Sequence, residues 1–122
     1  IAMATLIDPD FRARLRALNE KYAAGVPALM QAITQASGRC DSEGPRLEPL
    51  AELHRALHAV AGSAATFGFA ALGQEYRRLE QLVRAMLNTP AQAVAEWPAV
   101  RAQVEALLHW AARDAGATHF SV

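Results

Sequence analysis

The sequence predicts an all-α protein that folds as an antiparallel, up-down four-helix bundle, in which the first and last helices are kinked or split. Apolar residues recur at steps of three and four along four segments, which is the period of an α-helix. No segment alternates apolar and polar residues as a half-buried strand does. Short connections separate the four segments, and such connections join antiparallel neighbours in helix bundles.

The first helix is expected over residues 10–36. Its apolar stripe consists of Phe11, Leu15, Leu18, Tyr22, Val26, Leu29 and Ile33. Asp8 is suited to cap this helix, because Pro9 follows it at the first helical position, where proline is well tolerated. Gly25 and Pro27 predict a kink or a break, since proline removes a hydrogen-bond donor from the helix interior.

A polar stretch, SGRCDSEGP at residues 37–45, is rich in turn-forming residues and is expected to end the first helix. It contains Cys40, the single cysteine, so an intramolecular disulfide is impossible and a metal–thiolate cluster would lack its other ligands. These features favour a protein of the reducing cytoplasm. The N-terminus has no basic region followed by a long apolar run, so no export signal is expected.

Three further helices are expected at about residues 46–66, 70–87 and 90–114. Asn-Thr-Pro at residues 88–90 stops the third helix and caps the fourth, with proline at its first position. Pro98 is expected to kink the fourth helix or to mark an internal start within it.

Length and charge favour one domain over residues 1–122, with an N-terminal extension at residues 1–8 and a C-terminal tail at residues 115–122. A chain of 122 residues that is 52% hydrophobic can bury a single core. Twelve basic and twelve acidic residues balance to zero, so no global field favours nucleic acid or an anionic membrane. No apolar run is long enough to predict a membrane span. We expect a monomer.

The second helix carries a histidine at the edge of its core face. That face consists of Leu50, Leu53, Leu57, Val60 and Ala64. His58 lies about a third of a turn from the centre of this stripe, so its ring should face solvent. The positions one and two turns away are small: Ala51, Ala61, Gly62 and Ala65. Glycine in a helix costs roughly 1 kcal/mol relative to alanine, so these small residues suggest a surface that a partner must approach closely.

The third helix presents a second polar stripe beside its core face. The core face consists of Leu72, Tyr76, Leu79, Val83 and Met86, and the boundary stripe of Gly73, Arg77, Glu80 and Arg84. If the hairpin turns at residues 68–69, four pairs lie level across the two helices, within a residue or two. These pairs are His54 with Arg84, His58 with Glu80, Ala61 with Arg77, and Ala65 with Gly73.

A glutamate level with a histidine has a definite chemical use. The carboxylate of Glu80 can accept the Nδ1 proton of His58 and so fix the tautomer in which the Nε2 lone pair points outward. That lone pair is what a nucleophilic imidazole requires. Arg77 and Arg84, one turn to either side of Glu80, supply positive charge for an anionic group on Nε2, and the planar guanidinium suits phosphate oxygens.

These residues resemble a known family. The stretch LHAVAGSAATFGFAALGQEYRRLE at residues 57–80 is similar to the signature of histidine phosphotransfer (HPt) domains, particularly those of chemotaxis-type kinases and bacterial phosphorelays. The resemblance implies that His58 is phosphorylated and that Glu80 contacts its imidazole. It also implies a phosphocarrier without independent turnover, which exchanges phosphate with receiver domains of response regulators or takes it from a sensor histidine kinase. Mg²⁺ would belong to the receiver, and this chain would need no cofactor.

One position departs from the family pattern. Many HPt domains carry lysine three residues after the histidine, and here that position is Ala61. We hypothesise that Arg77 substitutes for the lysine, helped by Arg84. The surface that a partner contacts is expected to include His54, Ala61, Gly62, Ala65 and Gly73.

Several alternatives remain open at this point. His58 can be an ordinary boundary histidine, Gly62 a helix-packing glycine, and the two arginines plain solvated charges. His54 and His58 form an i, i+4 pair that could bind a metal with Glu80 as third ligand, although we expect no metal site. His109 and His119 receive no function.

Two rival functions compete with the phosphocarrier. One is an HPt-like module that docks receiver or kinase domains without transferring phosphate. The other is a metal-dependent four-helix hydrolase or di-iron protein, which would need paired Glu-x-x-His motifs that the sequence lacks.

Overall fold

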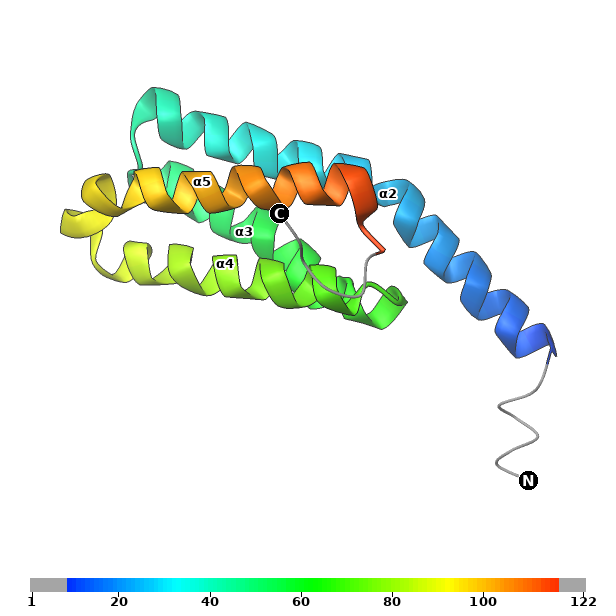
Figure 1. The fold of residues 1–122 in the computed structure, drawn as a ribbon. Helices are drawn as coiled ribbons and strands as arrows, with labels where there is room; N and C mark the ends of the chain where they lie inside the picture. The colour runs from blue at the N-terminus through cyan, green and yellow to red at the C-terminus, as the bar shows by residue number, and fades with distance from the viewer. Residues whose placement is uncertain (1–8, 117–122) are drawn as a thin grey trace.

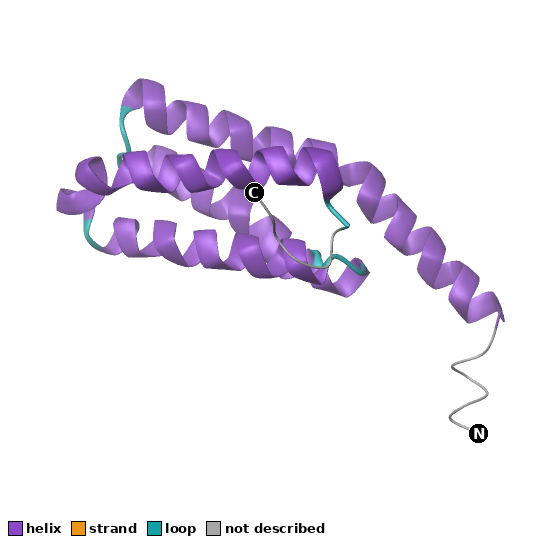
Figure 2. Cartoon of the chain, in the orientation of Figure 1, coloured by secondary structure: helices purple, strands orange, loops and turns teal. Residues whose placement is uncertain are grey.

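The computed structural model describes residues 9–116 and shows four long helices in that part of the chain (Figure 1). They are α2 (Pro9–Glu43), α3 (Leu47–Ser63), α4 (Ala70–Asn88) and α5 (Pro90–Asp114), with a short 3₁₀ turn, η1 (Ala65–Phe67), between α3 and α4. Figure 2 shows helices and short connections and no strand in the described residues. The N-terminal extension with Asp8, and most of the expected C-terminal tail with His119, lie outside them.

The helices form an antiparallel bundle, as the sequence predicts. Each helix packs on the next one along the chain, and α5 returns to pack on α2, so the order around the bundle is α2, α3, α4, α5 (Figure 1). The expected core faces of the second and third helices are confirmed, since all ten of their residues are at most 1% exposed. The fold class and the helix order therefore follow from the apolar periodicity alone.

The first helix is longer than the expected range of residues 10–36, and the polar stretch ends it only at the last residues of the stretch. Helix α2 runs on through the stretch to Glu43, and the turn comes at Gly44, whose φ of +91° is in the left-handed region. Ser37 and Cys40 continue the buried face of the helix, at 7% and 0% exposure. Cys40 is thus a core residue.

Neither internal proline splits its helix. Helix α2 is continuous through Pro27, and Figure 1 shows it change direction near the junction of its blue and cyan parts, which confirms the predicted kink but not a break. Helix α5 is likewise continuous through Pro98, so the predicted internal start there is wrong. Both prolines are exposed, so the carbonyl groups that lose a partner can be hydrated.

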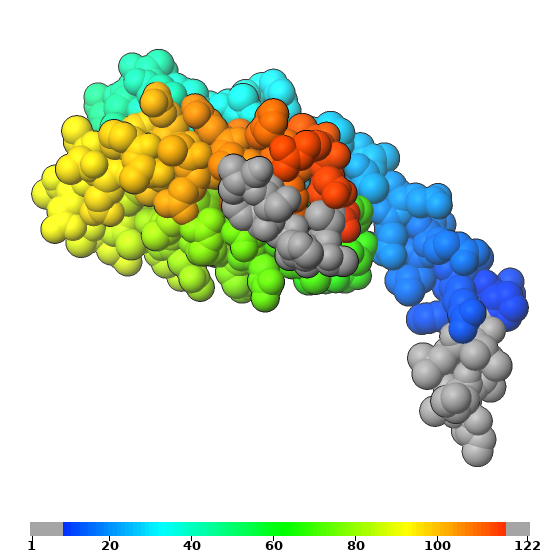
Figure 3. Space-filling view, in the orientation of Figure 1, coloured from blue at the N-terminus to red at the C-terminus, as the bar shows by residue number. Residues whose placement is uncertain are grey.

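The N-terminal part of α2 projects beyond the bundle (Figures 1 and 3). Phe11, Leu15 and Leu18 are 40%, 43% and 50% exposed, whereas Val26 and Ile33 further along the same stripe are buried. The α3–α4 hairpin turns back at Gly68, so most of the earlier part of the stripe lies beyond the end of the bundle. Only the C-terminal half of the predicted stripe therefore belongs to the core.

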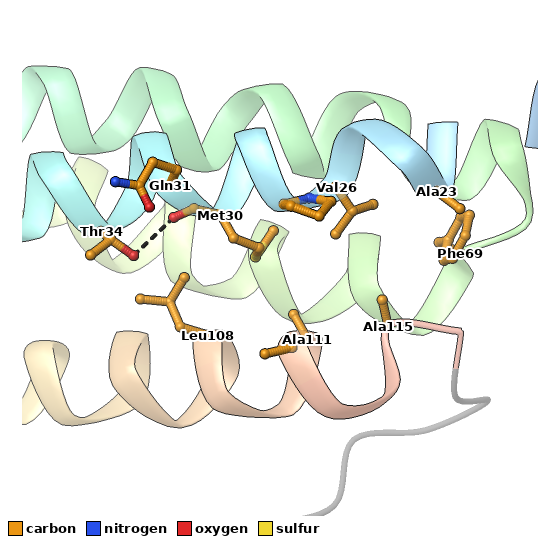
Figure 4. A pocket seen from close by; sticks show the side chains of 11 residues that line it. Ala23, Val26, Met30, Gln31, Thr34, Phe69, Leu108, Ala111 and Ala115 are labelled. Atoms are coloured by element: carbon orange, nitrogen blue, oxygen red, sulfur yellow. Dashed lines mark hydrogen bonds between the residues drawn. The ribbon is translucent and has the colours of Figure 1, made fainter. Parts of the chain in front are cut away.

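A groove of about 470 Å³ runs between α2 and α5 (Figure 4). Val26, Met30 and Thr34 line one side, Leu108 and Ala111 the other, and none of the groove's residues is titratable. Neither α2 nor α5 carries His58. This groove is a shallow gap in the apolar packing, and His58 is not among the residues that line it.

Two glycines in the α3–α4 hairpin have different roles. A Cβ atom at Gly73 would lie 3.4 Å from both Ala64 Cβ and Ala65 N, so α4 lies close to α3 here and leaves little room for a side chain longer than a methyl group. A Cβ atom at Gly62 would meet nothing within 4 Å. The alternative that Gly62 serves helix packing is therefore wrong, and Gly73 is the packing glycine.

We predict that these glycines respond oppositely to substitution. Gly62→Ala should raise the free energy of unfolding by about 0.5–1 kcal/mol, because alanine is the better helix former and its methyl group has open space. Gly73→Leu should lower it by about 1–3 kcal/mol, because atoms beyond Cβ would force α3 and α4 apart. Urea titration measures both values. A Gly73→Leu protein as stable as the parent would contradict the close packing of the hairpin.

Candidate functional site

His58 stands on the solvent-facing edge of α3, where the sequence places it. Its side chain is 65% exposed. Its neighbours Leu57 and Val60 are fully buried, and their packing fixes the orientation of α3 about its own axis. The imidazole is therefore accessible to a second macromolecule, and the backbone that carries it is rigid. Exposure alone does not distinguish His58 from an ordinary histidine at the edge of a bundle. The side chain that its ring contacts determines its chemistry.

That side chain belongs to Glu80 on α4. The Nδ1–H of His58 donates to Glu80 Oε2 at 2.8 Å, and the Glu80 side chain is only 10% exposed. The predicted pairing of these two residues is thus confirmed. Because Nδ1 is held by the carboxylate at the protein side, Nε2 lies at the outer edge of the ring with its lone pair directed away from the bundle. The arrangement supplies a nucleophilic nitrogen in a fixed orientation.

The rest of the predicted register also holds. Arg77 Nη2 donates to the carbonyl oxygen of Ala61 at 3.2 Å, so the guanidinium lies over α3 about one turn beyond His58. Ala65 and Gly73 are in contact distance across the hairpin. Arg84, one turn after Glu80, is close enough for its charge to act on His54.

Two of the expected partner-contacting residues are not on the surface. Ala61 is 4% exposed and Gly73 is buried, so the prediction that they face a partner is wrong. Both lie in the seam between α3 and α4, which a helical wheel drawn for one helix does not show. Gly62 and Ala65 are exposed, as expected, and because they are small no long side chain protrudes at these positions near the imidazole. Their part in partner binding stays a prediction.

His54 lies one turn before His58 and is mostly buried, with 19% of its side chain exposed. The two imidazole rings are nearly parallel, with centroids 6.1 Å apart. Burial lowers the pKa of His54 below its usual value of 6.5, a shift that Glu80 opposes and Arg84 assists. The lowered pKa favours the neutral form of His54 more than in a surface histidine.

The structure gives the metal-dependent rival no candidate centre. Within residues 9–116, no group of three or more histidine, cysteine, aspartate or glutamate side chains is placed to hold a metal ion. Glu80 uses one oxygen for His58, and the buried Nε2 of His54 faces its other oxygen. Burial raises the pKa of Cys40 to about 11, so this thiol is neutral at pH 7 and is not a nucleophile. No helix in the described residues could span a membrane.

The residues of a second groove, of about 460 Å³, were not identified from the sequence. It lies between α2 and the end of α3, where Tyr22 stacks on Phe67 at 5.0 Å and its hydroxyl bonds to Ser63 Oγ at 2.8 Å. Leu18 and Leu29 complete its apolar wall. The groove reaches α3 at Ser63, which follows the exposed Gly62 in the chain. The exposed apolar stripe of α2 was the signal that could have indicated it.

Comparisons with known proteins agree with this geometry. A family model described as the Hpt domain matches residues 12–110, which is more than half of the chain. The matched region contains α3, α4 and both members of the His58–Glu80 pair. No curated protein and no solved structure matches the chain.

The state of His54 has a consequence for stability. Because the pKa of His54 is lower in the folded chain than in the unfolded one, the unfolded chain binds more protons below pH 6.5, and acid weakens the fold. We predict that the free energy of unfolding falls less in His54→Gln than in the parent when the pH is lowered from 7.5 to 5. Chemical denaturation at a series of pH values measures this. His109→Gln, an exposed position on α5, is the matched control and should keep the parental slope. Equal slopes for parent and His54→Gln would refute the prediction.

Proposed function

The chain belongs to the Hpt domain family, and from this premise we propose that it is a phosphocarrier whose phosphoryl group is bound to His58 Nε2. Hpt domains have a phosphotransfer role in two-component signalling and act as carriers rather than as catalysts with turnover. The observation that supports His58 as the acceptor is its Nδ1 bond to the buried Glu80 on an otherwise exposed ring. We place the protein in the cytoplasm as a monomer.

The proposed step is an in-line displacement. The Nε2 lone pair attacks the phosphorus of an aspartyl phosphate on a receiver domain, and the bond from phosphorus to the carboxylate oxygen breaks. The aspartate leaves with that electron pair, and the imidazole gains a positive charge. The Nδ1 proton stays bonded to Glu80, whose negative charge stabilises the charged ring. The reverse step returns the phosphoryl group to a receiver, and a sensor histidine kinase is a second source.

Few groups of this chain are needed beyond that pair, since phosphoryl transfer depends mainly on positioning and charge. Mg²⁺ and most of the polar groups would come from the receiver. Arg77 provides positive charge near the position where the family commonly has lysine, because its guanidinium is anchored on Ala61 O. Arg84 contributes from the other side of Glu80.

The docking surface in this proposal surrounds the ring. Gly62 and Ala65 are exposed and small, so the acidic pocket of a receiver can reach Nε2 without obstruction. The apolar groove that Tyr22 and Phe67 line, with Leu18 at its edge, extends this surface onto α2. Its apolar lining suits a face that is covered when the partner docks.

One observation favours a second candidate, an Hpt-type module that docks its partners without accepting phosphate. Ala61 stands where many family members carry lysine, and the site is correspondingly less positive. The kept pairing of His58 with Glu80 favours transfer. Incubation with a phosphorylated receiver separates the two candidates, because docking alone leaves no label on this chain.

We predict that a radiolabelled phosphoreceiver transfers its label to the protein in an acid-labile, base-stable form. His58→Gln should carry no label. Glu80→Gln should accept label at least about tenfold more slowly, since a hydrogen bond to a charged group contributes roughly 1.5 kcal/mol or more. Gel autoradiography over time measures both rates. Label on His58→Gln, or the absence of label on the folded parent with every receiver supplied, would refute the phosphocarrier.

A second prediction concerns the arginine proposed in place of lysine. Arg77→Ala should slow transfer by several-fold, because it removes a cation near the incoming phosphate. Arg78→Ala is the matched control, since Arg78 is adjacent in the chain but bonds to Glu75 and to Gln103 of α5, away from His58. It should transfer at the parental rate. Parental transfer by Arg77→Ala would remove this role for Arg77.

A further inference from the structure

Glu80 has two carboxylate oxygens, and each faces a different imidazole. Oε2 accepts the Nδ1 proton of His58 at 2.8 Å. Oε1 lies 3.9 Å from Nε2 of His54, which is beyond a hydrogen bond but within the range of an ion pair. One buried carboxylate therefore lies between two titratable rings, of which only one is the proposed phosphate acceptor.

The Nε2 atom of His54 has no other partner. It is buried, and it makes no hydrogen bond within the described residues. A buried polar atom without a partner is costly, so a small movement that brings it onto Oε1 is favourable whenever it carries a proton.

The charges that act on His54 come from the two helices of the hairpin. On α4 they are the carboxylate of Glu80 and the guanidinium of Arg84, and on α3 they are His58 and Arg55. Glu80 alone favours a proton on His54, and the other three oppose it together with burial. The balance lowers the pKa of His54, so its neutral form is favoured near neutral pH and its protonated form in acid.

We propose that His54 is a positioning residue that competes with His58 for Glu80 and thereby slows phosphoryl transfer in acid. The proposal rests on the proposed function of His58. While His54 is neutral, Glu80 holds the Nδ1 proton of His58, and Nε2 is ready to attack. When His54 gains a proton, its Nε2–H closes on Oε1 and neutralises the carboxylate. The bond to His58 weakens, and the positive charge that develops on the His58 ring loses its stabilising partner.

The first test reads the site without any phosphate. In the ¹⁵N NMR titration of the full chain, the His58 ring nitrogens should show a second inflection below pH 6.5 as His54 titrates. This inflection should disappear in His54→Phe, which keeps a buried ring but cannot bind a proton, and in His54→Gln, which covers the case that the first variant folds poorly. His109→Gln should retain it. A His58 titration that is identical in the parent and both His54 variants would overturn the proposal.

The second test uses the reaction. The ratio of the parental transfer rate to that of His54→Phe should fall at least about threefold when the pH is lowered from 7.5 to 5.5. A constant ratio of the two rates across this range would overturn the proposal. If no variant accepts phosphate at any pH, the phosphocarrier assignment fails, and the NMR titration still decides whether His54 and His58 share Glu80.

Discussion

The hydrogen bond between His58 and Glu80 depends on the register of two helices. The bond is 2.8 Å long, and it joins residues that are 22 positions apart in the chain. It forms because η1 and the left-handed Gly68 turn the chain sharply, and because Gly73 lets α4 pack closely on α3. A slip of one residue would rotate Glu80 by about 100° and remove it from the ring. The chemistry of the site is therefore a consequence of the hairpin's geometry.

Much of the fold and the central pair of the site could be predicted from the sequence, because both depend on periodicity. Ten core residues on α3 and α4 recur at helical spacing, and the position of the turn then determines which boundary residues are level. The end of α2 could not be predicted this way. Ser37 and Cys40 belong to a stretch whose composition is typical of turns. Their side chains become core residues because α2 packs on α3 and α5.

The burial of Ala61 and of Gly73 was missed for a related reason. A wheel for one helix shows the direction of a side chain but not the distance to its neighbour, and a close interhelical approach buries residues at the edge of the core. The same close approach buries the Glu80 carboxylate beside an exposed imidazole. A carboxylate in that position is shielded from water, so its charge acts on the ring more strongly than a surface charge would.

The projecting part of α2 has a separate consequence. Phe11, Leu15 and Leu18 are 40%, 43% and 50% exposed and do not belong to the buried core, so the backbone there depends mainly on local helix propensity. An isolated helix of this length is marginal in water. Its amide protons can exchange with solvent through brief local opening, whereas those around Ile33 and Tyr76 require the whole bundle to open. The two ends of one continuous helix thus belong to different units of cooperative unfolding.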